Sequence, residues 1–141
     1  MTHIFLEMIP PAGTAQQRKI NFHTGHTYLP SRVKETQKVL EEALKPFVPD
    51  KPIVKPMKVI QRWFYPLPKS RRKKGIVTLP KTTTGDADNI AKLLNDACTK
   101  CGIWLDDRYI YSLTIEKYWV DPVFHPVGIE IEIMTDDADE E

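Results

Sequence analysis

Two pairs of aspartates lie at the two ends of one predicted helix. Asp86 and Asp88 come at its start, and Asp106 and Asp107 follow its end. Carboxylate oxygens are the ligands that Mg²⁺ and Mn²⁺ prefer in proteins. A turn at residues 102–105 brings the second pair toward the first only if the segment that follows runs back alongside the helix. On that condition the sequence predicts an oxygen-rich site for a divalent metal.

Lys92 lies four residues after Asp88, so the two side chains share one side of the predicted helix. Two interpretations are open. The pair can be an ordinary surface ion pair, which contributes little to stability. Alternatively, Lys92 is a cation beside a metal site, where it offsets negative charge on a phosphate. The convergence of the aspartates favours the second interpretation.

The helix itself is predicted from apolar residues that recur at helical spacing. Asp86 is placed to cap its first turn, and Gly102 is placed to end it in a left-handed conformation. The apolar face is formed by Ile90, Leu93, Leu94, Ala97 and Cys101.

The charges of the chain are divided between its two parts. Residues 1–85 contain 16 Lys/Arg and 5 Asp/Glu, whereas residues 86–141 contain 4 and 14. Residues 51–85 include ten basic side chains and no acidic one. Such a segment can be an accidental run or a solvated loop, but its position before the aspartates favours a phosphate-binding surface. The predicted DNA contacts are Arg71, Arg72, Lys73, Lys74, Lys81 and Lys92.

Two motifs within residues 81–119 resemble a known family. Residues 86–92 read D-A-D-N-I-A-K, and residues 102–107 read G-I-W-L-D-D. This combination is similar to the signature of the RusA-like endodeoxyribonucleases, which resolve Holliday junctions. The resemblance implies a homodimeric, Mg²⁺-dependent endonuclease that cuts four-way DNA junctions by paired symmetric nicks.

The same resemblance implies roles for individual residues. Asp86, Asp88 and Asp107 correspond to catalytic metal ligands, and Asp106 supports them. Lys92 corresponds to a residue that contacts phosphate or stabilises the transition state. One position departs from the family pattern, because Gly85 stands where a basic residue often precedes the first aspartate. Arg72, Lys74 or Lys81 would then supply that charge.

The length of 141 residues is that of one domain. Alternating patterns predict strands at residues 3–9, 53–65, 108–119 and 128–134, and helical patterns predict helices at 31–45 and 86–101. The expected fold is α+β, with a small, mostly antiparallel or mixed sheet covered by two helices. The last two strands are expected to pair as a hairpin. Residues 1–134 would form the nuclease domain, 14–27 a loop, and 135–141 a disordered acidic tail.

Other features of the sequence bear on localisation, zinc binding and alternative functions. No apolar run has membrane-spanning length and no leader pattern is present, so a cytoplasmic protein without a membrane partner is expected. Cys98, Cys101, His23 and His26 offer four zinc ligands, but Cys101 lies on the apolar helix face, where a free cysteine is usually a core residue. A catalytically silent DNA-binding protein and a metal-dependent nucleotide phosphohydrolase remain alternatives.

Overall fold

The computed structural model describes residues 1–11, 19–20, 27–28, 31–73, 75, 77–83 and 86–136, with residues 19–20, 27–28 and 31–33 described by their backbone alone. The chain forms two compact units, and each is assembled from separate segments. The sheet unit consists of Met1–Pro10, Val54–Thr83 and Arg108–Glu141. The helix unit consists of Pro11–Ile53 and Thr84–Asp107. No described helix is long and apolar enough to cross a membrane.

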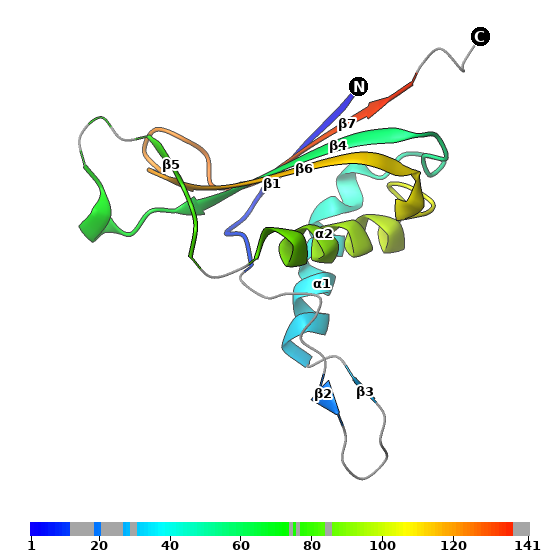
Figure 1. Cartoon of the computed structure of the whole chain (residues 1–141), viewed down its shortest axis with the longest axis horizontal. Helices are drawn as coiled ribbons and strands as arrows, with labels where there is room; N and C mark the ends of the chain where they lie inside the picture. The colour runs from blue at the N-terminus through cyan, green and yellow to red at the C-terminus, as the bar shows by residue number, and fades with distance from the viewer. Residues whose placement is uncertain are drawn as a thin grey trace. The chain divides into compact units, whose positions relative to one another are not determined.

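The sheet unit contains one five-stranded mixed sheet, whose strands lie in the order β1-β7-β4-β6-β5 (Figure 1). β4 and β6 run parallel, whereas the other three neighbouring pairs are antiparallel. With the two helices described below, this confirms the predicted α+β class. The strands are β1 (Thr2–Glu7), β4 (Met57–Pro66), β5 (Thr78–Pro80), β6 (Ile110–Val120) and β7 (Gly128–Thr135).

The predicted hairpin between the last two strands is wrong. β7 pairs with β1 and β4, and β4 separates it from β6. Electrostatics explains this order. Glu116 on β6 and Glu130 on β7 would be neighbouring like charges in a direct pairing, whereas β4 places Arg62 between them.

Alternate side chains divide the sheet into two different faces. On one face, Ile4 of β1, Ile131 of β7 and Gln61 of β4 lie in one row, and all three are buried. Gln61 Oε1 accepts a hydrogen bond of 3.0 Å from the indole nitrogen of buried Trp63, which satisfies both polar groups. Other residues on this face are apolar and buried as well, namely Leu6, Val59, Ile129 and Ile133.

The opposite face carries a cluster of charges around Arg62. Its guanidinium donates to Glu116 at 2.8 Å, to Glu130 at 2.6 Å and to Glu132 at 3.1 Å. His3 Nε2 lies 3.0 Å from the second oxygen of Glu130. The hydrogen bond from Arg62 to Glu130 contributes most to raising the pKa of Arg62. Burial would raise the pKa of Glu130, but His3 and Arg62 lower it below its ordinary value.

One glycine allows β1 and β7 to approach each other. Gly128 pairs with Glu7 at the start of β7. A Cβ atom at this position would overlap the backbone carbonyl oxygen of Leu6 and would also lie 2.8 Å from the ring of Phe5. The close approach of these two strands therefore requires glycine at position 128.

The helix unit is built on two helices that pack against each other, α1 (Ser31–Leu44) and α2 (Ala87–Cys101). Leu40 and Leu44 of α1 are buried, as are Leu93, Leu94 and Ala97 of α2. A short 3-10 turn, η1 (Lys45–Phe47), follows α1. Within the segment predicted as a loop, β2 (Lys19–Ile20) and β3 (Thr27–Tyr28) form a short antiparallel pair, and residues 14–18 and 21–26 lie outside the described part.

Candidate active site and nucleic-acid interface

Asp86 and Asp88 lie at the N-terminal end of α2, and both are exposed. Asp86 occupies the capping position with extended backbone angles, as predicted, but its side chain makes no capping hydrogen bond. The helix backbone therefore does not engage the carboxylate of Asp86. An exposed carboxylate at a helix N-terminus is also favoured by the partial positive charge of the helix.

Lys92 lies on the same side of α2 as Asp88, one turn further along, and is exposed. Asp96 follows one turn later, about 12 Å from Asp88 along the helix axis. Desolvation raises the pKa of Asp96, Lys92 and Lys100 lower it, and Asp107 raises it. Asp96 is thus an additional acidic residue beside the predicted set, and its spacing from Asp88 and Lys92 was the sequence signal that could have identified it.

After α2 the chain turns back along the helix. Gly102 has φ 93°, the left-handed conformation predicted for it, and the amide of Ile103 donates to Cys98 O at 3.0 Å. Ile103 and Leu105 each form a backbone hydrogen bond of 3.1 Å with Ile53. Asp107 contributes to raising the pKa of Asp96, which indicates that its carboxylate lies near the third turn of α2. The shared metal site stays a prediction.

Trp104 anchors this turn. Its side chain is fully buried, and its indole nitrogen donates a hydrogen bond of 2.9 Å to Thr99 Oγ1 on α2. Residue 104 also forms an isolated parallel bridge with Ile53. The tryptophan of the G-x-W-L-D-D motif thus fixes the path of the backbone that leads to Asp106 and Asp107.

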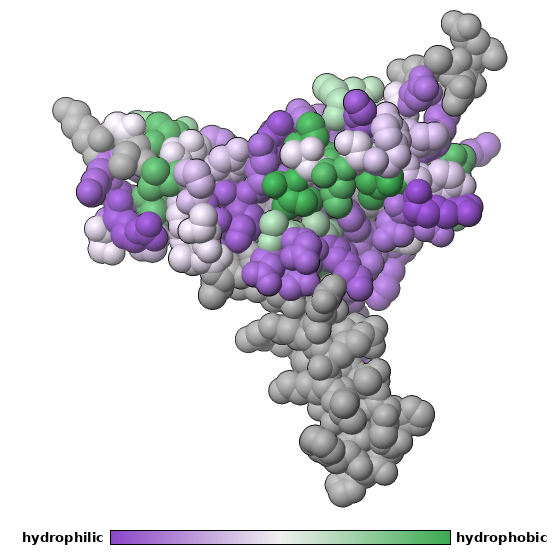
Figure 2. Space-filling model, viewed as in Figure 1, coloured by the Kyte–Doolittle hydropathy of each residue, from purple (hydrophilic) through white to green (hydrophobic). Residues whose placement is uncertain are grey.

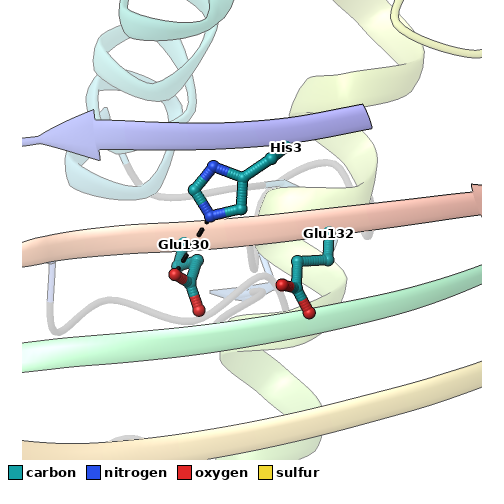
Figure 3. A group of neighbouring side chains, drawn as sticks. All are labelled: His3, Glu130 and Glu132. Carbon is teal, nitrogen blue, oxygen red and sulfur yellow. Dashed lines mark hydrogen bonds and ion pairs between the residues drawn. The ribbon is translucent and has the colours of Figure 1, made fainter. Parts of the chain in front are cut away.

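The predicted acidic residues do not form the tightest carboxylate group in the described structure. The one described group that brings three possible ligand atoms within 4.8 Å of one another is His3, Glu130 and Glu132 on the sheet (Figure 3). Arg62 already donates to both glutamates of that group, so its negative charge is compensated by a side chain. We interpret it as a structural ion-pair cluster, and Asp86, Asp88, Asp106 and Asp107 remain the predicted metal ligands.

Asn89 provides an observation that fits a metal beside these residues. The side-chain oxygen of Asn89 is buried and has no hydrogen-bond partner among the residues that the structure describes. A buried, unsatisfied oxygen is costly, and such exceptions often mark a functional position. Oxygen donors from aspartate and asparagine are also the chemical set that suits Mg²⁺.

The predicted DNA contacts in the basic segment have different environments. Arg71, at the end of η2 (Lys69–Arg71), is exposed, as is Lys73. Arg72 is half-buried, and its Nε donates to Leu67 O at 2.9 Å, so part of its role is to hold the loop. Lys74 and Gly85 lie outside the described residues.

Lys81 differs most from its expected environment. It was predicted as a surface contact, yet it is only 6% exposed. Its Nζ lies 4.5 Å from the ring centre of Tyr65 and 5.0 Å from that of Trp119. Desolvation lowers the pKa of Lys81, and the charge of Lys117 lowers it further. The proximity of Lys117 and Trp119 to Lys81 was not predicted from the sequence, because no local motif links them to the basic segment.

Cys98 and Cys101 are free thiols. Cys98 is fully buried on α2, and this burial raises the pKa of its thiol well above the ordinary value. His23 and His26, the other ligands of the zinc alternative, lie outside the described residues. Cys98 is thus a core residue, whereas Cys101, for which the sequence predicted a core position, is half-buried.

Comparison with known proteins identifies the family. The model of one protein family, described as Endodeoxyribonuclease RusA, matches residues 9–134 of the chain. The chain belongs to the RusA endodeoxyribonuclease family. The RusA match includes both motifs at 86–92 and 102–107, the basic segment and all strands of the sheet except β1 and the last residue of β7. No curated protein matches the chain.

Membership in the RusA family defines the general chemistry. The family is one of nucleases that cut within DNA strands and act on DNA junctions, and its resolvases generally depend on a divalent metal. The five-stranded mixed sheet with two helices is consistent with the RusA fold. Family membership assigns no role to a particular residue, so the site described above remains a prediction.

Proposed function

We propose that the protein is a Mg²⁺-dependent endodeoxyribonuclease that resolves four-way DNA junctions in the cytoplasm by paired symmetric nicks. One observation carries this proposal. In a chain of the RusA family, Asp86, Asp88 and Lys92 are exposed on the first turns of α2, with no carboxylate used for helix capping. Asp107 acts electrostatically on Asp96 of the same helix, which supports a position of its carboxylate near α2.

Each residue has a role in this proposal. Asp86, Asp88 and Asp107 hold the metal, Asp106 supports them, and Mn²⁺ is an alternative ion. A bound divalent metal lowers the pKa of a water molecule and polarises the scissile phosphate. Lys92 offsets the charge that develops on the phosphate oxygens. Five basic side chains contact the DNA backbone and increase the affinity of the protein for DNA in a salt-dependent manner. They are Arg71, Arg72, Lys73, Lys74 and Lys81.

A homodimer is the proposed assembly, because one set of carboxylates makes one nick and resolution requires two. A two-fold dimer supplies two equivalent sites. Tyr111 and Leu113 of β6 are 62% and 43% exposed, and they are candidates for the subunit contact. Figure 2 shows hydrophobic side chains gathered at the surface where β6 runs in Figure 1. Trp104 is fully buried, so it is not a candidate for this contact.

The test is incubation of the purified protein with a synthetic four-way junction and Mg²⁺. Symmetric nicks on opposite strands are expected, with no cleavage in the presence of a chelator and little cleavage of a linear duplex of the same sequence. Junction binding without cleavage would favour the silent DNA-binding protein. Hydrolysis of nucleotides without junction binding would favour the phosphohydrolase. Light scattering that shows an active monomer would contradict the dimer.

A further inference from the structure

The end of the sheet where β4, β5 and β6 meet gathers basic and aromatic side chains on one face. Tyr65 pairs with Trp119 across the β4–β6 register, and Leu79 pairs with Trp119 across β5–β6. The rings of Tyr65 and Trp119 form an edge-on pair with centres 6.3 Å apart. The amide of Lys81 donates to Lys117 O at 3.0 Å, which brings the chain after β5 beside β6.

Two lysines converge at this point. Lys81 Nζ and Lys117 Nζ each donate to the backbone carbonyl oxygen of Thr83, both at 3.3 Å. Because they share one acceptor, the two nitrogens lie no more than 6.6 Å apart. Two ammonium groups at this separation repel each other. An anion placed between them would be attracted by both.

The surroundings of the lysine pair are also cationic. The guanidinium of Arg71 lies 5.5 Å from the ring centre of Trp119. Arg71 also lines an open hollow of about 320 Å³ together with Ser70, Lys73 and Leu79. The carboxylates of β6 and β7 do not reach this face, because Glu116 and Lys117 are consecutive on a strand and point to opposite sides. Their counter-charge, Arg62, lies with them on the other face.

We propose that Lys81 and Lys117 together bind one phosphate group of the DNA backbone, with Tyr65 and Trp119 holding Lys81 in place. The aromatic rings attract the ammonium group of Lys81 through cation–π interactions, and these contacts restrict its position. Phosphate has several acceptor oxygens, so it can accept from both lysines at once. Thr83 lies three residues before Asp86, so the proposed phosphate site and the predicted metal-binding motif are close along the chain.

The identity of the phosphate as part of DNA rests on the proposed function, but the anion site does not. The first experiment therefore uses inorganic phosphate, monitored by NMR through the indole resonance of Trp119, which is assigned with Trp119→Phe. A saturable shift is expected in the wild type and its loss in Lys81→Met/Lys117→Met, with chloride at equal ionic strength as control. No shift in the wild type, or the same shift in the double variant, would overturn the site.

The second experiment measures binding of the four-way junction in the presence of chelator as the salt concentration is varied. If the lysines share one phosphate, the slope of log K against log salt should fall by about one in the double variant and by less in each single variant. Lys58→Met, which removes an exposed lysine elsewhere on β4, is the matched control. An unchanged slope, or a fall of about two, would contradict a shared phosphate.

The two experiments separate this inference from the proposed function. Phosphate binding by a protein that does not bind junctions would refute the proposed function and leave the anion site intact. Junction cleavage by a protein whose Trp119 resonance does not shift with phosphate would support the proposed function and refute the anion site. Lys117→Arg should restore most of the binding, and thermal unfolding of each variant checks that the sheet is retained.

Discussion

Replacing Arg62 by methionine should destabilise the protein strongly at neutral pH. Arg62 is the shared partner of Glu116, Glu130 and Glu132, and its removal leaves three carboxylates on neighbouring strands. Methionine retains part of the apolar stem but no charge. The change therefore tests whether the order of β6, β4 and β7 depends on this cation.

The size of the effect follows from the geometry. A hydrogen bond to a charged group contributes about 1.5–3 kcal/mol when well shielded, but these side chains are 23–36% exposed, so we take about 1 kcal/mol for each of the three. The oxygens of Glu130 and Glu132 bound to Arg62 Nη1 are at most 5.7 Å apart, so their repulsion adds at least about 0.7 kcal/mol, the value in bulk water. The expected loss is about 4 kcal/mol, or on the order of 10 °C in Tm.

The effect should depend on pH in a defined direction. The pKa of Glu130 is lowered in the folded protein, so its contribution is present above its unfolded pKa and is lost as the pH falls through the folded value. The difference between wild type and Arg62→Met should therefore be largest at pH 7 and should shrink only as the pH falls below the ordinary glutamate pKa of about 4.3 and through the lowered pKa of folded Glu130.

Urea denaturation at pH 7 and at lower pH measures this difference. Lys45→Met is the matched control, because its ion pair with Glu42 is 67% and 69% exposed and should contribute less than about 0.5 kcal/mol. A loss below about 1 kcal/mol at pH 7, or one that persists unchanged in acid, would refute the role assigned to Arg62.

Three further changes test the site and the sheet. Asp88→Asn should reduce junction cleavage by orders of magnitude while junction binding in chelator persists; cleavage at the wild-type rate would remove Asp88 from the metal ligands. Changing the basic loop to alanine at Arg71, Arg72, Lys73 and Lys74 should weaken binding to all DNA and make that binding less dependent on salt. Fluorescence anisotropy measures both effects, and an unchanged salt slope would show that the loop is a solvated loop without DNA contacts. Gly128→Ala should cost about 2 kcal/mol or more in urea denaturation, because the strands must separate, and a cost below about 1 kcal/mol would contradict the close approach.

Local patterns in the sequence were sufficient to predict α2 and its flanking residues. The apolar spacing from Ile90 onward and the left-handed Gly102 specify a helix that ends at Cys101, and both features are found. Because one face of this helix is apolar, Asp88 and Lys92 are forced onto the other face and into solvent. The alternating isoleucines of residues 129–133 predicted β7 for the same reason.

Features that depend on distant residues could not be predicted in this way. The order of the strands places Arg62 beside three glutamates that are distant in the sequence, and no local pattern predicts these contacts. β5 has only three residues and ends in Pro80, so it gives almost no alternating signal. The burial of Lys81 depends on Tyr65 and Trp119, which come from two other strands.

The parallel pairing of β4 and β6 has a consequence for the order in which the protein becomes active during its synthesis. Parallel neighbours require a crossover connection, and here residues 67–109 form it, including the basic loop, β5, α2 and every predicted metal ligand. Closing a connection of this length costs about 3 kcal/mol of chain entropy, which is recovered only when β6 pairs with β4. A growing chain that has reached residue 109 therefore contains all the predicted ligands before it contains the strand that closes the crossover. Under the proposed function, nuclease activity is therefore expected only after β6 has emerged and paired with β4.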